Sequence, residues 1–202
     1  VLFSDVRNFT TISESMEPKQ LTRLINGFLT PITEVIHHQR GTIDKYMGDA
    51  VMAFWGAPLE DPQHALHALT ASMDMIRRVN ELKAEFEARG WPEIRIGVGI
   101  NSGEMNVGNK GSEFRVDYTV LGDAVNLGSR LEGLTKYYGV RLIVSESTAA
   151  DLTGMALRRL DRVKVKGKHE PVTIYEAVGF HDTISSEKAN EILASNEALD
   201  RY

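Results

Sequence analysis

The stretch around which this chain is organised reads GTIDKYMGDAVMAFWG and occupies residues 41–56. It predicts two short strands, Thr42–Tyr46 and Ala50–Trp55, joined by a tight turn at residues 47–49, because glycine reaches positive φ freely and aspartate tolerates turn positions. The second strand is almost wholly apolar, so we expect both of its faces to be buried. A carboxylate at the mouth of such a hairpin, here Asp49, is costly to bury unless it caps the turn or meets a cation.

Strand and helix patterns alternate on either side of this hairpin. An apolar strand over residues 1–6 precedes a helix that starts near Pro18, and a second long helix is predicted over residues 61–89. The order strand, helix, hairpin, helix, strand predicts an α+β fold, a ferredoxin-like (split βαβ) mixed sheet with helices on one face. Further strands are expected at residues 93–101, 103–108, 115–120, 140–144, 157–165 and 172–178, a loop at 109–112, and helices at 123–138 and 146–152.

Two aspartates stand at strand ends that this topology brings together. The first strand lies antiparallel to the second hairpin strand, so Asp5 and Asp49 are expected to be neighbours. Without a nearby histidine or thiol, two carboxylates favour Mg²⁺ or Mn²⁺. Two such ions, roughly 3.5–4 Å apart, clamp the attacking and leaving oxygens of a phosphoryl displacement. The alternative is a pair of unrelated turn aspartates.

A second group of polar residues lies on the helix predicted over residues 123–138. Asp123 is placed as its N-cap, and Asn126 and Arg130 stand at i and i+4, so both project from one face. An amide beside a guanidinium suits a sugar and a phosphate, and arginine can stabilise charge that develops in a transition state. The alternative interpretation is an ordinary solvated helix face.

Length and composition limit the number of domains and the kinds of partner and metal site that this chain can have. The 202 residues predict one domain, residues 1–180, followed by an accessory helix or mobile tail at 181–202. The net charge of −5 argues against nucleic acid as a partner, and the lack of cysteine excludes disulfides and thiolate metal sites. The chain opens on Val1 inside a predicted strand, so we expect an upstream regulatory or membrane module outside this sequence, and a cytoplasmic catalytic domain.

Three separated motifs carry a resemblance to a known family. They are FSDVRNFT at residues 3–10, KYMGDA at 45–50 and YTVLGDAVN at 118–126. Together they resemble the class III nucleotidyl cyclase catalytic domain, of the bacterial homodimeric adenylyl cyclase type, and the likeness extends from Val1 to about Val178. It implies conversion of a nucleoside triphosphate to its 3′,5′-cyclic monophosphate and pyrophosphate, in a dimer whose active sites lie between two catalytic domains.

The resemblance also assigns roles to residues of the two polar groups. It implies that Asp5 and Asp49 bind two divalent metal ions, Mg²⁺ or Mn²⁺. Asn126 matches the residue that orients the ribose, and Arg130 the one that stabilises the α-phosphate in the transition state. A chain that carries every part of the site implies a symmetric homodimer with two equivalent, shared sites.

Substrate contacts are implied at four further positions. Lys45 and Thr119 match the base-selecting pair, an ammonium that donates to the adenine ring and a hydroxyl that accepts from its exocyclic amine; guanylyl cyclases usually carry Glu and Cys there. Lys166 matches a triphosphate-binding lysine, with Lys168 as the alternative, and Arg115 is a candidate phosphate contact. ATP is therefore the expected substrate. The competing hypotheses are a guanylyl cyclase, a catalytically silent nucleotide sensor, and another two-metal enzyme of ferredoxin-like fold.

Overall fold

The computed structural model describes residues 1–164 and 171–200, and it contains the predicted hairpin. Strand β2 (Thr42–Met47) turns into β3 (Ala50–Phe54). After its first residue β3 is buried throughout, as its apolar sequence predicts. The turn is made by Gly48, whose φ of 68° lies in the left-handed region that glycine adopts without strain.

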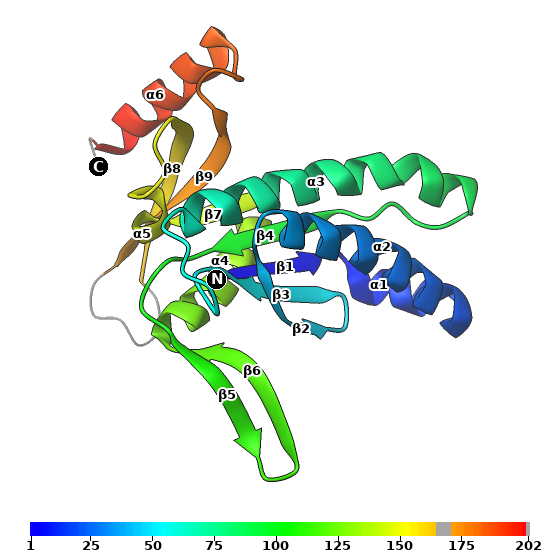
Figure 1. Cartoon of the computed structure of the whole chain (residues 1–202). Coiled ribbons are helices and arrows are strands. Elements are labelled where there is room, and N and C mark those ends of the chain that lie inside the picture. Colours follow the sequence, from blue (N-terminus) through cyan, green and yellow to red (C-terminus); the bar gives the residue numbers. More distant parts are fainter. Residues whose placement is uncertain (165–170, 201–202) are drawn as a thin grey trace.

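The hairpin belongs to a seven-stranded mixed sheet (Figure 1). Its other strands are β1 (Leu2–Val6), β4 (Ile96–Ile100), β7 (Leu142–Ser145), β8 (Met155–Val163) and β9 (Val172–Phe180). The strand order is β2-β3-β1-β4-β7-β9-β8, with β1 antiparallel to both of its neighbours and β4 parallel to β7. The first four strands are those of a split βαβ unit, so the predicted α+β, ferredoxin-like class is confirmed.

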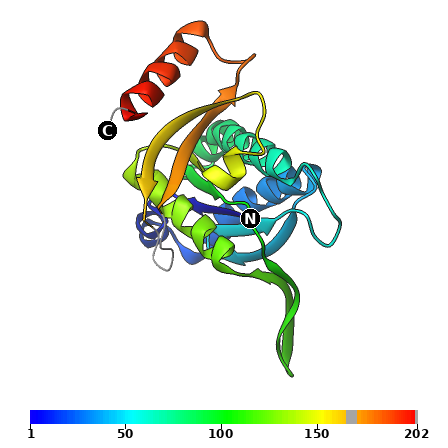
Figure 2. The same ribbon diagram turned by 90° about the vertical axis from the view of Figure 1, so that its left-hand side faces the viewer.

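Helices cover both faces of this sheet, whereas the sequence predicted helices on one face only. The helices of the described residues are α1 (Phe9–Ser15), α2 (Pro18–His38), α3 (His64–Ala88), α4 (Asp123–Tyr137), α5 (Glu146–Ala149) and α6 (Ser186–Asp200). Helices α2 and α3 pack on one face and α4 lies on the other (Figure 2). Every residue of β4 is buried, so the centre of the sheet needs apolar cover on both sides.

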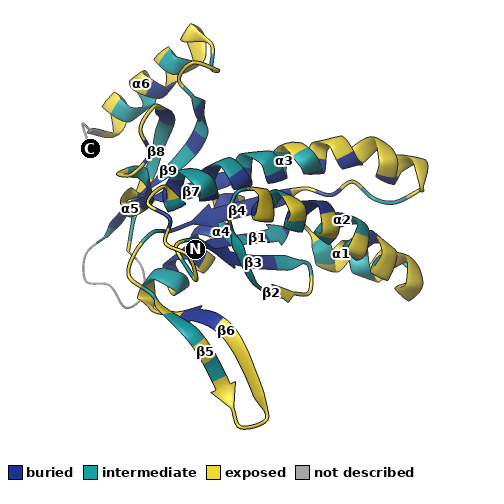
Figure 3. Ribbon diagram, viewed as in Figure 1, coloured by how far each residue is buried: buried dark blue, intermediate teal, exposed yellow. Residues whose placement is uncertain are grey.

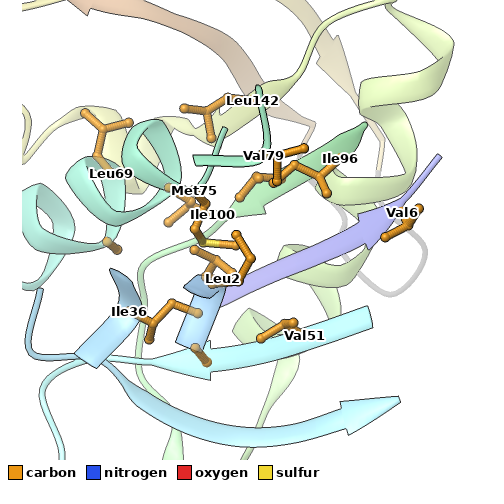
Figure 4. Packing of buried hydrophobic residues seen from close by; sticks show 14 of the residues in the cluster. Leu2, Val6, Ile36, Val51, Leu69, Met75, Val79, Ile96, Ile100 and Leu142 are labelled. Carbon is orange, nitrogen blue, oxygen red and sulfur yellow. The ribbon is translucent and has the colours of Figure 1, made fainter. Parts of the chain in front are cut away.

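The larger core lies between the sheet and the helices α2 and α3. Figure 4 shows Leu2, Val51 and Ile100 of the sheet meeting Ile36 of α2 and Met75 of α3. On the opposite face a smaller core joins residues of α4 to β7 and β9, made by Leu127, Leu131, Val140, Ile143, Val172 and Ile174. Because α4 is held by this second core, the sheet fixes where its polar residues stand.

A separate two-stranded hairpin, β5 (Asn106–Ser112) and β6 (Arg115–Leu121), projects from the body and is exposed along much of its length (Figure 3). The predicted strand ended at Gly108 and was followed by a loop at 109–112, which is wrong, since β5 continues to Ser112. Glycine and asparagine have low strand propensity, but cross-strand pairing such as Asn109 with Tyr118 overrides it. Phe114 at the tip is 97% exposed.

Within residues 181–202, Ser186–Asp200 form α6, which contacts β8. The Asn196 side chain donates to the Leu157 carbonyl at 3.0 Å and accepts from the Arg159 backbone N–H at 2.7 Å, and Ile192 is buried. The segment is therefore an accessory helix attached to the edge of the sheet. Among the described residues, none of the helices combines the length and the apolar character that crossing a membrane requires.

Candidate active site

Two carboxylates meet where β1 ends and β3 begins. The antiparallel register sets Ser4 opposite Val51, so Asp5 lies beside the β2–β3 turn that carries Asp49. The Val6 backbone N–H donates to both side chains, to Asp5 Oδ1 and to Asp49 Oδ2, at 3.1 Å each. The predicted proximity of Asp5 and Asp49 is confirmed.

The two carboxylates repel each other. The pKa of Asp49 is raised from 3.8 to about 7, first by burial and then by hydrogen bonding to Asp5 and repulsion from it. Among the residues described, no cluster of three or more His, Cys, Asp or Glu side chains could hold a metal ion. Two carboxylates nevertheless suit Mg²⁺, which is commonly held by one or two carboxylates together with water and substrate phosphates. A divalent cation would relieve the repulsion, so the donor set fits such an ion.

Arg7 and Glu132 form an ion pair close to the two aspartates, which the sequence analysis did not predict. Arg7 Nη1 is 3.5 Å from Glu132 Oε1, and Arg7 Nη2 donates to the Thr135 hydroxyl of α4. Gly97 makes room for this guanidinium, since a Cβ there would collide with it. The pKa of Glu132 is raised to about 7: burial is the largest cause, Arg7 opposes the rise, and repulsion from the two aspartates adds to it. The sequence feature that could have indicated this ion pair is the basic residue Arg7, directly after the strand that carries Asp5.

Lys45 and Thr119 come from different hairpins and share one partner, Asp44. The Thr119 hydroxyl donates to Asp44 Oδ2 at 2.5 Å, and Lys45 Nζ lies 3.1 Å from Asp44 Oδ1. The Val120 backbone N–H also donates to Asp44 Oδ2, at 3.2 Å. The Asp44 side chain is completely buried, while that of Lys45 is 42% exposed. Sequence reasoning missed Asp44, because strand alternation sends adjacent residues to opposite faces.

Asn126 and Arg130 both stand on an exposed part of α4, one turn apart. The helix begins differently from the prediction: Gly122 is the N-cap, and Asp123 is the first helical residue rather than the cap. A carboxylate in the first turn still interacts favourably with the helix dipole. The exposed face leaves Asn126 and Arg130 accessible to a ligand or a second chain.

Most of the chain matches a known protein family. The profile of the adenylate and guanylate cyclase catalytic domain covers residues 1–176. The chain belongs to this family. A curated relative, the adenylate cyclase of Anabaena cylindrica, is 40% identical over 181 residues, and adenylate cyclase 1 of Rhizobium meliloti is 35% identical over 189. These alignments cover 87% and 93% of the chain but 36% and 28% of the relatives, so the cyclase domain spans about a third of their length.

Solved cyclases share the fold of this domain. The adenylyl cyclase CyaB of P. aeruginosa superposes with a TM-score of 0.81 at 32% identity, covering 91% of this chain and 95% of CyaB. The guanylyl cyclase Cya2 superposes with a TM-score of 0.82 at 33% identity, covering 91% and 93%. The two kinds of cyclase are equally similar, so overall likeness does not separate adenine from guanine specificity.

The remaining predicted substrate contacts are Arg115 and Lys166. Arg115 stands beside the tip of the β5–β6 hairpin, where its exposed guanidinium pairs with Asp117 at 3.2 Å. The structure does not bring it to the two aspartates, and it stays a prediction. Lys166 and the alternative Lys168 lie outside the described residues.

Proposed function

We propose that this chain is the catalytic domain of an adenylyl cyclase, which converts ATP to 3′,5′-cyclic AMP and pyrophosphate. The observation that carries the choice of adenine is the meeting of Lys45 and Thr119 at Asp44. An ammonium only donates hydrogen bonds, which matches the ring nitrogen acceptor of adenine, and a hydroxyl can accept from its exocyclic amine. A guanine-selective pair would require the reverse polarity.

Asp5 and Asp49 are proposed to hold two divalent metal ions, Mg²⁺ or Mn²⁺. The convergence of the two carboxylates and the raised pKa of Asp49 support this assignment. Bound there, the ions would lower the pKa of the ribose 3′-hydroxyl and neutralise charge on the triphosphate. The chain itself supplies the placement, because the Val6 N–H orients both side chains at a strand end.

On α4, Asn126 is proposed to orient the ribose and Arg130 to stabilise negative charge on the α-phosphate. Their common exposed helix face supports this pairing. A planar guanidinium can donate two parallel hydrogen bonds to phosphate oxygens, and its charge is most useful where charge builds up in the transition state. The reaction is an in-line attack of the ribose 3′-oxygen on the α-phosphorus, with pyrophosphate leaving, so no protein nucleophile is needed.

The active unit is proposed to be a symmetric homodimer with two shared sites. The exposed apolar side chains of the β5–β6 hairpin, Phe114 and Val116, support a contact with a second chain. Arg115, beside the tip of the same hairpin, and Lys166 are proposed phosphate contacts. A chain that carries aspartates, base-selecting residues and the α4 pair can complete two equivalent sites by two-fold symmetry.

The test of this function is cyclic nucleotide production from ATP and from GTP, with Mn²⁺ and with Mg²⁺, over a range of protein concentration. We expect cyclic AMP, rising more steeply than linearly with protein because dimers form as concentration increases. Preferential cyclic GTP would establish a guanylyl cyclase instead. A confirmed dimer that yields no product would establish a silent nucleotide-binding domain.

Exchange of the base-selecting pair is expected to shift the substrate. In the Lys45→Glu/Thr119→Cys variant a carboxylate replaces the ammonium and accepts from the guanine edge, so the ratio of kcat/KM for ATP to that for GTP should fall by about 10²-fold. The matched control is Lys188→Glu, which reverses a lysine on α6, with an unchanged ratio expected. An unaltered ratio in the double variant would contradict the assigned pair.

Metal binding is expected to weaken as pH falls below about 7. The raised pKa of Asp49 means that the folded protein keeps a proton which the unfolded chain releases near 3.8, so the metal-free protein loses stability as pH rises between these values. Mn²⁺ binds the deprotonated form, so its affinity should fall by about tenfold for each pH unit below about 7. The measurement is the Mn²⁺-induced rise in Tm at pH 6 and pH 8.

Two variants separate the contribution of Asp49 from that of other groups. In Asp49→Asn the difference between the two pH values should largely vanish, although Glu132, whose pKa is also raised by burial, is still present. Asp182→Asn, at an exposed position outside the site, should keep it. An equal rise in Tm at both pH values in the unaltered protein would exclude Asp49 as a metal ligand.

A further inference from the structure

We propose that Asp44 sets the hydrogen-bond polarity of the adenine pocket: it makes the Thr119 hydroxyl an acceptor only and holds the Lys45 ammonium beside it. Asp44 is thus a positioning residue for the choice of adenine over guanine. This inference rests on the proposed adenylyl cyclase function and adds a residue that contacts both members of the base-selecting pair without itself facing the solvent.

A β-bulge places the carboxylate between its two partners. In the pairing of β2 with β3, Ile43 lies opposite Ala53 and Lys45 opposite Met52, so Asp44 is an extra residue without a cross-strand partner. In a regular strand Asp44 and Lys45 would point to opposite faces. The bulge changes the direction of one of these two side chains. Asp44 and Lys45 can therefore form an ion pair of 3.1 Å although they are adjacent, and Asp44 also contacts Thr119 of β6.

Among the described residues, the donors that contact the Asp44 side chain lie against its carboxylate oxygens. Oδ2 accepts from the Thr119 hydroxyl and from the Val120 N–H, and Oδ1 faces the Lys45 ammonium. A carboxylate accepts hydrogen bonds through both oxygens, and these contacts use it in that way. A threonine hydroxyl has one hydrogen and two lone pairs. Because that hydrogen is committed to Asp44, Thr119 can only accept from a ligand.

The bases differ in the polarity of the edge that such a pocket reads. Adenine carries an amino group, a donor, where guanine carries a carbonyl oxygen, an acceptor. An acceptor-only Thr119 oxygen attracts the adenine amine and repels the guanine carbonyl. A hydroxyl free to rotate would instead satisfy either base. The discrimination therefore depends on Asp44 as well as on Thr119.

The burial of Asp44 argues against a purely structural role. Its side chain is fully buried, and within the described part of the chain Oδ1 has the ion pair with Lys45 but no hydrogen bond. Burying a carboxylate oxygen without a hydrogen bond is unfavourable. A neutral side chain could accept from the Val120 N–H at a lower desolvation cost. A carboxylate, however, presents acceptors to Thr119 and to Lys45 at once.

The test is the Asp44→Asn variant, read out as the ratio of kcat/KM for ATP to that for GTP and as competition of the two nucleotides for binding. Asparagine has the same size but one donor and one acceptor, so either Lys45 or the Thr119–Val120 side must face an NH₂ group. We expect the ratio to fall by about tenfold or more, which corresponds to the loss of one hydrogen bond of defined polarity. An unchanged ratio would overturn the inference.

Combination with Thr119→Val shows whether Asp44 acts through the hydroxyl. Asp44→Asn and Thr119→Val should each lower the ratio. Because both remove the same interaction, the decrease in the double variant should be smaller than the product of the two single decreases. Thr119→Ser, which keeps the hydroxyl, should retain the ratio. Multiplicative effects would show that Asp44 does not act through Thr119. If Asp44→Asn fails to fold, Thr119→Val and Thr119→Ser still decide whether a hydroxyl of fixed polarity governs the choice.

Asp61→Asn is the matched control for a buried aspartate. Asp61 is buried, accepts from the Gln63 N–H and contacts His67 at 2.7 Å, outside the pocket. Its loss should lower stability and leave the nucleotide ratio unchanged. The outcomes separate the two proposals: an unaltered protein without preference for ATP in binding or turnover refutes the adenylyl function, whereas preference that survives Asp44→Asn refutes only the role of Asp44.

Discussion

A one-to-one mixture of the Asp5→Ala and Asn126→Ala variants is expected to make cyclic AMP although neither variant does so alone. Asp5 belongs to the carboxylate pair at the end of β1, and Asn126 to the exposed face of α4. If each site takes its aspartates from one chain and its α4 residues from the other, both homodimers have two broken sites. The mixed dimer keeps one intact site.

The expected magnitudes are large in both directions. Removal of a carboxylate that holds the metals, or of a group that orients the ribose, should lower kcat by about 10²–10³-fold or more. With random exchange half of the dimers are mixed and each has one working site, so the mixture should regain about a quarter of the unaltered activity. The measurement is cyclic AMP production after the variants are mixed and allowed to exchange subunits.

The control places both substitutions in one chain. Mixed with the unaltered protein, the Asp5→Ala/Asn126→Ala chain breaks both sites of every mixed dimer, so it should suppress activity rather than restore it. The mixture of the two single variants and the mixture of the double variant with the unaltered protein contain the same substitutions in equal amounts. If the complementing mixture stays inactive while mixed dimers are demonstrated, the sites are not shared between chains.

Gly99→Ala is expected to destabilise the domain and to displace α4. Gly99 lies in β4, and a Cβ at this position would collide with the backbone nitrogen of Glu132 and come within 2.8 Å of the Gly128 carbonyl oxygen, both in α4. Backbone atoms of a packed helix cannot rotate away as a flexible side chain can. We expect the free energy of unfolding to fall by about 3 kcal/mol, measured by urea denaturation.

The same substitution should lower catalysis beyond its effect on stability. A shift of α4 moves Asn126 and Arg130 together, and a displacement of about 1 Å can reduce the rate by about 10²-fold. Gly133→Ala is the matched control, because it adds a methyl group to the same helix with no atom within 4 Å of the new Cβ. It should be neutral or stabilise α4 by about 0.5–1 kcal/mol. Equal effects of the two substitutions would show that the close packing of β4 against α4 is unimportant.

Local sequence patterns predicted the helices and strands of the fold and one pair of residues in the candidate site. The hairpin at residues 41–56 and the alternation of strands and helices followed from turn chemistry and apolar periodicity. The proximity of Asp5 and Asp49 also followed, because in a split βαβ sheet the order of strands dictates which strand ends meet. The length of β5 did not follow, because strand pairing overrode the low propensity of its glycines.

The amino-acid sequence by itself thus determined the class of fold, the position of the aspartate pair and the motifs shared with cyclases. Only the tertiary structure decided that α4 covers the second face of the sheet, that Arg7 pairs with Glu132, and that Asp44 joins Lys45 to Thr119. The physical reason is the range of the interactions. Periodicity reports neighbours along one element, whereas a bulge, a glycine contact between a strand and a helix, or a shared carboxylate depends on residues far apart in the chain.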